Sequence, residues 1–243
     1  MSPGASPQLS SLSILFPAYN DAGTIADLVR AGADVARGLT SDYELIVVND
    51  GSRDETGRVL AQLLREQPAL SVITHGTNRG YGAALRSGFA AARKDWIFYT
   101  DGDGQYDPRE LVHLAALAAT EVDIVNGWKR ARGDGWARAW LGRAYHALLR
   151  LAFELPVRDT NCDFRLFRRS LLDRVRLEHD SGAICLELVV KFSQAGARFR
   201  EAPVSHFPRC HGRSQFLTIG RVVATLRDDA RIWWRLRTRA TTP

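Results

Sequence analysis

Two carboxylates one residue apart, Asp101 and Asp103, stand among glycines directly after the apolar run at residues 96–100. The run is short and rich in β-branched and aromatic residues, which predicts a buried β-strand. Ligands of open parallel sheets bind beyond the carboxyl ends of the strands, and carboxylate oxygens suit Mg²⁺ or Mn²⁺. The pair therefore indicates a metal site. The alternative is a polar turn, in which Asp and Gly are favoured for local reasons.

Polar clusters also follow two other predicted strands. Pro17, Tyr19 and Asp21 end an apolar run near the N-terminus, and Asp50 ends a second one. Helical segments separate the runs, and this alternation predicts βαβ units and a mostly parallel sheet. Right-handed crossovers bring the strand ends to one edge of such a sheet, so the acidity gathered there favours a binding site. The strands are expected at residues 12–16, 43–48, 71–74, 96–100, 122–125 and 198–204.

A glycine-rich segment, residues 76–82, precedes a predicted helix that begins at Ala83. Glycines here could simply permit a turn. The functional interpretation is that the helix N-terminus offers N–H groups to an anion. The GxGxxG fingerprint of dinucleotide sites is absent, so NAD is not inferred.

Four stretches occur in order along the chain: residues 16–21 (FPAYND), 47–52 (VVNDGS), 78–82 (NRGYG) and 100–105 (TDGDGQ). In this combination the chain resembles the inverting glycosyltransferases of family 2, in particular the dolichyl (polyprenyl) phosphate mannosyltransferase-like branch. The resemblance covers roughly residues 12–214. It implies the α/β GT-A fold, with a mostly parallel central sheet flanked by helices, and we add a C-terminal amphipathic helix.

The same resemblance implies which residues bind the donor. The donor-binding residues would be Pro17, Tyr19, Asp21, Asp50, Gly80, Asp101, Arg209, Arg213 and Ser214. The catalytic residues would be Asp101, Asp103, Gln105 and Arg213, with Asp101 and Asp103 holding Mg²⁺ or Mn²⁺. Asp21 stands where Glu is commoner and Asn49 where a second Asp is often found. These departures leave the donor open between GDP-mannose and a UDP-hexose.

The acceptor side is expected in the second half, where residues 127–150 carry six basic residues against one acid. Periodicity fits equally an amphipathic helix packed on the sheet and an interfacial helix beside a lipid headgroup. The resemblance favours the second, with Arg130, Arg132 and Arg143 contacting the acceptor phosphate. The stretch at residues 157–169 resembles the family's Asp-x-x-x-Gly-Phe-Arg motif. It would place Asp159 and Arg165 at the acceptor, unless they form a structural ion pair.

The net charge of +6 lies at the C-terminal end of the chain. From Arg209 onward there are eight arginines and two aspartates, whereas the preceding part is neutral. The helix expected after Gln215 has an arginine face opposite an apolar one, which is typical of peripheral membrane helices on anionic lipid. No apolar stretch approaches the ~20 residues of a bilayer span. We therefore expect a cytoplasmic protein bound peripherally to the cytoplasmic face of the membrane.

Length and composition fit one globular domain with extensions: 243 residues, 45% hydrophobic and 25% charged. We expect a flexible N-terminus at 1–10, a glycosyltransferase domain at 11–214 and a basic helical tail at 215–243. Within the domain, the nucleotide-sugar half would span about 11–126 and the acceptor half 127–214. Three cysteines without CxxC spacing argue against a disulfide framework.

The leading hypothesis is a metal-dependent inverting glycosyltransferase that moves a sugar from a nucleotide sugar to a polyprenyl phosphate. An alternative acceptor is a saccharide or protein hydroxyl, which needs a base such as Glu187, Asp159 or Asp163. A third reading is a non-catalytic nucleotide-sugar or nucleic-acid binding module. The neutral body and the acidic sheet edge argue against a nucleic-acid partner. The oligomeric state stays open.

Overall fold

The computed structural model describes residues 9–130, 153, 155–209 and 219–240. The first half alternates strands and helices: β1 (Leu12–Ala18), α1 (Ile25–Leu39), β2 (Tyr43–Asn49), α2 (Thr56–Glu66), β3 (Leu70–Thr74), α3 (Tyr81–Ala91) and β4 (Trp96–Thr100). The second half contains η1 (Pro108–Glu110), α4 (Leu111–Ala115), β5 (Ile124–Lys129), β6 (Phe164–Arg168), η2 (Arg169–Leu171), α6 (Ile184–Gln194), β7 (Phe199–Val204) and α7 (Ile219–Ala240).

The strands form one sheet of seven, in the order β3-β2-β1-β4-β6-β5-β7. The pairs β1–β2, β1–β4, β2–β3 and β5–β7 are parallel, whereas β6 runs antiparallel to both β4 and β5. The prediction of a mostly parallel sheet is confirmed. Strand β6 was not predicted, because its Phe-Arg-Leu-Phe-Arg sequence lies in the stretch that was interpreted only as an acceptor motif.

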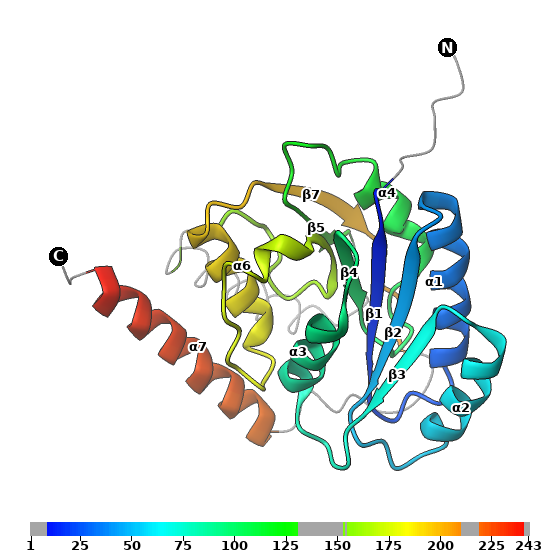
Figure 1. The fold of residues 1–243 in the computed structure, drawn as a ribbon. Helices are drawn as coiled ribbons and strands as arrows, with labels where there is room; N and C mark the ends of the chain where they lie inside the picture. The colour runs from blue at the N-terminus through cyan, green and yellow to red at the C-terminus, as the bar shows by residue number, and fades with distance from the viewer. Residues whose placement is uncertain (1–8, 131–152, 154, 210–218, 241–243) are drawn as a thin grey trace.

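Helices cover both faces of the sheet because its strands are apolar on both sides. Along β1, Ile14 and Phe16 point into the core shared with α1 and α2, whereas Leu15 points into the core shared with α3 and α6. At Gly88 of α3 a Cβ atom would lie 2.3 Å from a methyl group of Leu15, so only glycine lets α3 approach β1 this closely. Figure 1 shows the resulting layers, with α1 and α2 on one side and α3 and α6 on the other.

The antiparallel direction of β6 determines which residues lie next to the carboxyl ends of the parallel strands. Thr100, the last residue of β4, pairs with Phe164, the first residue of β6. Because β6 is antiparallel, the chain just before Phe164 lies at the edge where β1, β2 and β4 end. Residues 159–163 thereby reach the edge that carries Asp101 and Asp103.

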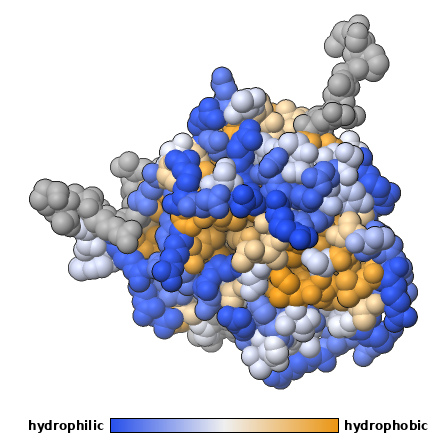
Figure 2. Space-filling view, in the orientation of Figure 1, coloured by the Kyte–Doolittle hydropathy of each residue, from blue (hydrophilic) through white to orange (hydrophobic). Residues whose placement is uncertain are grey.

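Helix α7 packs beside α6 through Ile232, which joins Leu186 and Val190 in a small apolar cluster. Other apolar side chains of α7 face solvent: Val223 is 58% exposed and Trp234 is 66% exposed. Within the described part of the chain, no helix combines the length and apolarity that a bilayer crossing requires. Figure 2 shows mostly hydrophilic residues over α7 and an apolar area over β3 and α2.

Candidate active site

One pocket of about 350 Å³ lies where β1, β2 and β4 end. The loops after these strands supply most of the residues predicted for the donor side, because parallel strands deliver their ends to one edge. The predicted residues that line the pocket are Pro17, Tyr19, Asp21, Asp50, Asp101, Asp103, Gln105 and Arg209. The structure therefore brings these eight predicted residues together at one pocket, and their roles there stay a prediction.

Asp50 is buried and organises the glycine-rich segment rather than pointing freely into the pocket. Its Oδ1 accepts the N–H of Arg79 and its Oδ2 accepts the N–H of Gly80, both at 2.9 Å. The imidazole of His75 lies 2.6 Å from Oδ1 and 2.9 Å from the hydroxyl of Ser87. The predicted donor residue Gly80 therefore acts at this edge by holding Asp50, with φ at +103°.

Asp101 and Asp103 lie side by side in the pocket, each already bonded to a neighbour. The hydroxyl of Tyr81 donates to Asp101 at 2.6 Å, and Asp103 accepts the N–H of Gln105 and a guanidinium N–H of Arg209. Burial, together with the charges of Asp163 and Asp103, raises the pKa of Asp101 well above its usual range. A pocket that penalises its own carboxylates in this way gains from a bound cation.

The pair fits Mg²⁺ or Mn²⁺ by the chemistry of its donors, since both ions prefer oxygen ligands. Among the described residues, no three His, Cys, Asp or Glu side chains converge as a complete metal cage. Mg²⁺ sites of this kind use one or two carboxylates and complete their shell with waters and substrate phosphates. Asp101 and Asp103 would hold the ion in that way.

Asp21 and Arg209 complete the donor side. Burial raises the pKa of Asp21 to about 6, although the N–H of Tyr19 donates to its carboxylate at 2.9 Å and opposes that shift. Arg209 lies 3.9 Å from Asp21 and contacts Asp103 more closely. Its guanidinium is therefore positioned among the carboxylates where a diphosphate and metal would sit. Arg213 and Ser214, also predicted here, lie outside the described residues.

The predicted acceptor residues are spread over different places. Arg130 is exposed just after β5, and Arg132 and Arg143 lie outside the described residues. Arg165 is fully buried and donates to Asn126 at 2.6 Å, to the Tyr99 hydroxyl at 2.8 Å and to the Thr160 carbonyl at 3.0 Å. Its guanidinium thus holds the loop before β6.

Asp159 belongs to the same loop and is buried. Its carboxylate accepts the N–H of Asn161 at 3.1 Å, and its carbonyl accepts from Asn126 at 2.9 Å. Neither Asp159 nor Arg165 is among the described residues that line the pocket. Both shape the loop that carries Asn161 and Asp163 to the pocket wall.

Two carboxylates considered as bases occupy different environments. Asp163 lines the pocket, and the thiol of Cys185 donates to it at 3.0 Å. Burial raises its pKa. Glu187 is fully buried on α6, where it pairs with Lys191 at 2.6 Å, and it is not among the described pocket residues.

Several pocket residues escaped the sequence analysis, chiefly Lys129, Tyr81, Asn161, Cys185, His206 and Thr225. Lys129 ends β5, and its ammonium donates to the carbonyl of Asn161 at 2.9 Å. The predicted strand stopped at Val125, because Asn126 and Gly127 are typical of a turn. Extending it by four residues would have placed Lys129 at the same edge as the aspartates.

The sheet and the acidic pocket at its carboxyl edge define a GT-A-type sugar-nucleotide transferase architecture. The sequence model of Glycosyl transferase family 2 matches residues 13–176, and the chain belongs to this family. The resemblance inferred from the four motifs is thereby confirmed.

The chain is similar to the undecaprenyl-phosphate 4-deoxy-4-formamido-L-arabinose transferases of Sodalis glossinidius (strain morsitans) and Enterobacter sp. (strain 638). The identities are 28% over 211 residues and 29% over 210 residues, each covering 86% of this chain. The chain spans 64% and 63% of the length of these two relatives.

Solved structures share the fold at lower identity. Glucosyl-3-phosphoglycerate synthase from Mycobacterium tuberculosis, in complex with Mn²⁺, UDP and glucosyl-3-phosphoglycerate, superposes with a TM-score of 0.69 at 22% identity, covering 90% of this chain and 79% of that one. Mannosyl-3-phosphoglycerate synthase from Rubrobacter xylanophilus gives 0.71 at 19% identity, covering 96% and 75%.

Proposed function

We propose that the protein transfers a sugar from a nucleoside diphosphate sugar to a polyprenyl phosphate, with inversion at the anomeric carbon and with Mg²⁺ or Mn²⁺. The observation that carries the proposal is the pocket in which Asp101, Asp103 and Arg209 meet at the carboxyl edge of the sheet. The relatives named for undecaprenyl phosphate support the acceptor class.

The acidic residues and the cations of the pocket would bind different parts of the nucleotide sugar. Tyr19, Asp21 and the segment fixed by Asp50 would receive the nucleotide. The metal, when bound to Asp101 and Asp103, would neutralise the charge that builds on the departing diphosphate. Arg209 would turn from Asp103 to the phosphate oxygens, because guanidinium groups bind phosphate as a fork.

Lys129 at the end of β5 is another cation that lines the pocket. It would orient the acceptor phosphate, whose oxygen is ionised at neutral pH. That oxygen forms the new bond to the anomeric carbon while the bond to the diphosphate breaks, so no general base is required. Arg130, and the predicted Arg132 and Arg143, would attract the same anionic headgroup from outside the pocket.

Peripheral attachment to the membrane is part of the proposal. Helix α7 carries exposed apolar side chains, among them Val223, Leu226 and Trp234, together with exposed arginines. A helix of this composition lies in the lipid interface, with its cations at anionic headgroups. The acceptor would then reach the pocket without leaving the bilayer surface.

A donor and acceptor screen tests the proposal. Purified protein is incubated with Mn²⁺ or Mg²⁺, GDP- and UDP-sugars and undecaprenyl or dolichyl phosphate in detergent, and the lipid extract is analysed by mass spectrometry. We expect a glycosylated lipid phosphate, and a loss of about 1,000-fold in its rate in Asp103→Ala. The exposed Asp34→Ala on α1 serves as the matched control. Nucleotide release with no lipid product would contradict the acceptor assignment.

The placement of Asp163 favours a second candidate function. Its carboxylate lines the pocket, and burial raises its pKa, so it could accept a proton from a hydroxyl acceptor. A saccharide or protein hydroxyl would then replace the lipid phosphate. Asp163→Asn would abolish turnover in that case. With a phosphate acceptor, which brings its own ionised oxygen, we expect the substitution to leave substantial activity.

A further inference from the structure

We propose that Glu187 of α6 is a positioning residue that couples helix α7 to the donor side of the pocket. It acts through the bridging loop (residues 178–181), which lies between α7 and the glycine loop (residues 79–82). The inference rests on the proposed function, because the pocket it affects is the one assigned to the nucleotide sugar.

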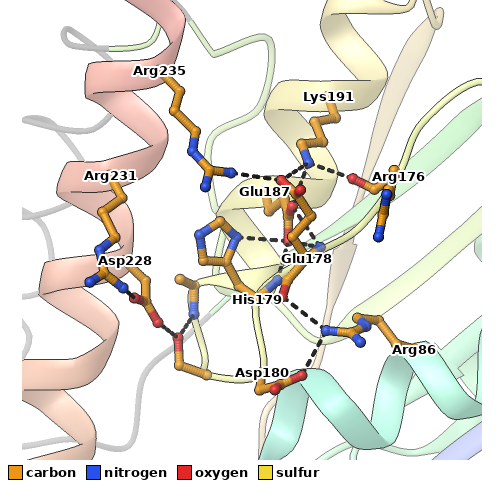
Figure 3. A network of polar contacts seen from close by, with 12 residues as sticks. Arg86, Arg176, Glu178, His179, Asp180, Glu187, Lys191, Asp228, Arg231 and Arg235 are labelled. Atoms are coloured by element: carbon orange, nitrogen blue, oxygen red, sulfur yellow. Dashed lines mark hydrogen bonds and ion pairs between the residues drawn. The ribbon is translucent and has the colours of Figure 1, made fainter.

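The carboxylate of Glu187 is the anchor of the bridging loop (Figure 3). It is fully buried, and it accepts the N–H of Glu178 at 3.0 Å and the N–H of His179 at 3.1 Å. Lys191 lies 2.6 Å away and Nδ1 of His179 lies 3.0 Å away. Burial alone would raise the pKa of Glu187, but the bonds from His179 and Lys191 outweigh it and lower the pKa to about 2. A buried charge with this many partners holds its neighbours in one arrangement.

The bridging loop in turn supports the glycine loop. The carbonyl of Asp180 accepts the N–H of Gly82 at 2.9 Å. A Cβ atom on Gly80 would lie 2.5 Å from that carbonyl oxygen, and one on Gly82 would lie 2.3 Å from the carbonyl oxygen of His179. The two loops are therefore in backbone contact, with no room for a side chain between them. This contact accounts for Gly80 and Gly82 of the glycine-rich segment, for which an anion site or a turn was predicted.

Arg86 of α3 ties the same two segments together from the side. Its guanidinium donates to the carbonyl of Glu178 at 2.9 Å and to the carboxylate of Asp180 at 2.7 Å (Figure 3). Because α3 begins at the glycine loop, a shift of the bridging loop would move the start of α3 with it.

The glycine loop contacts the carboxylates of the pocket, so a shift of the bridging loop would be transmitted to them. The N–H groups of Arg79 and Gly80 hold Asp50, and the hydroxyl of Tyr81 donates to Asp101. Three hydrogen bonds, joined by short stretches of backbone, thus lead from Glu187 through the bridging loop and the glycine loop to Asp101, which would bind the metal. Glu187 itself is not among the described residues that line the pocket.

Helix α7 docks on the other side of the bridging loop. The hydroxyl of Ser181 donates to Asp228 at 2.8 Å, and Arg235 donates to the carboxylate of Glu178 at 2.8 Å. Arg231 braces Asp228 at 3.2 Å (Figure 3). Thr225 of the same helix lines the pocket directly. The helix proposed to lie on the membrane is therefore in direct contact with the bridging loop, which supports the donor side of the pocket.

Coupling between two sites is reciprocal. If docked α7 favours the arrangement that binds nucleotide, bound nucleotide must favour docked α7 by the same free energy. A purely structural role for Glu187 and Asp228 predicts something different, namely a loss of stability without a selective loss of nucleotide affinity. The two roles can be separated by measuring affinity and local protection on the same variants.

The experiment measures the Kd of UDP and of GDP, each with Mn²⁺, by calorimetry on the full chain. Wild type is compared with Glu187→Gln, with Asp228→Asn and with Glu66→Gln, which removes an exposed ion pair far from the network. We expect both network variants to raise the Kd of the nucleotide that wild type binds at least fivefold, and Glu66→Gln to change it less than twofold. Asp228→Asn keeps the test valid if Glu187→Gln does not fold.

Hydrogen exchange supplies the second readout. Nucleotide with Mn²⁺ should protect amides of α7 and of the bridging loop in wild type, and Asp228→Asn should expose α7 and remove that protection. Unchanged α7 exchange in Asp228→Asn, or freed α7 with an unchanged nucleotide Kd, would overturn the inference. If wild type binds neither nucleotide, the proposed function fails first, and this outcome is distinct from a failure of coupling.

Discussion

The proposed donor wall of the pocket (Asp21, Asp50 and Asp101) and its proposed acceptor wall (Lys129 and Asp163) are built by different means. On the donor wall, Asp21, Asp50 and Asp101 follow the ends of three parallel strands and reach the pocket by the path of the local chain. On the acceptor wall, Lys129 ends β5, and Asp163 arrives through an antiparallel strand held by a buried arginine. The comparison teaches that one wall depends on strand ends and the other on long-range contacts.

The sharpest test of this difference is Arg165→Met. Removing the buried guanidinium takes away a hydrogen-bond donor from each of Asn126, Tyr99 and Thr160, which we expect to lower the free energy of unfolding by about 3 kcal/mol. Urea denaturation measures the loss. The exposed Arg158→Met, which breaks a surface ion pair with Glu201 and a cation–π contact with Trp128, should cost only about 1 kcal/mol.

The same variant should affect the two walls unequally. If the walls are independent, folded Arg165→Met protein will bind nucleotide and Mn²⁺ within threefold of wild type while its KM for the lipid phosphate rises. An equal loss on both sides would show that the comparison is wrong.

Acid titration probes the network behind the pocket. The pKa of Glu187 is lowered from 4.5 to about 2, so its contribution to stability is present above pH 5 and is lost as the pH falls towards 2. The shift corresponds to about 3 kcal/mol. We expect Glu187→Gln to flatten this part of the stability curve measured by urea denaturation between pH 2 and 6. Glu66→Gln removes an exposed carboxyl whose pKa is also lowered, by its bond with Arg30, but solvent screens that pair, so the slope should change far less than in Glu187→Gln. A curve for Glu187→Gln parallel to that of wild type would contradict the assignment.

Lys129→Met tests the proposed acceptor wall. Loss of one charge-assisted bond to a phosphate should raise the KM for polyprenyl phosphate about tenfold and leave the KM for the nucleotide sugar unchanged. Steady-state kinetics with each substrate varied in turn measures the split. Lys94→Met, in which the lysine pairs with Asp42 on the surface, is the control. A rise confined to the donor KM would move Lys129 to the donor wall.

The smallest effect is expected at the membrane. Trp234 is 66% exposed on α7, and Trp234→Ala should weaken binding to vesicles of anionic phospholipid about fivefold in a flotation assay. Leu64→Ala removes another exposed apolar side chain, 45% exposed on α2 and away from α7, and should leave binding unchanged. Equal losses in both variants would mean that α7 has no special part in attachment.

The same contrast explains what sequence reasoning could reach. Parallel strands end where apolar runs stop, so the gathering of Asp21, Asp50 and Asp101 at one edge of the sheet was predictable from the sequence. Their donor role comes from the family resemblance and stays a prediction. Lys129 was missed because Asn126 and Gly127 resemble a turn, although β7 and β6 hold them in a strand. Arg165 was assigned to the acceptor, but its packing depends on contacts with β4 and β5 that no local pattern encodes. The role of Gly80 and Gly82 against the bridging loop likewise required the tertiary structure.

The position of β6 also matters for recombining members of the family. In the sheet, β6, β5 and β7 form a contiguous block that joins the remaining strands only through the five residue pairs between β4 and β6. In a chimera with junctions before Ile124 and after Val204, the pairing of β4 with β6 is the only strand pairing in the sheet that joins residues of the two parents. A junction between β5 and β6 would instead mix two parents inside the block. The acceptor preference of two relatives would therefore be exchanged most simply by transferring residues 124–204 as one continuous segment.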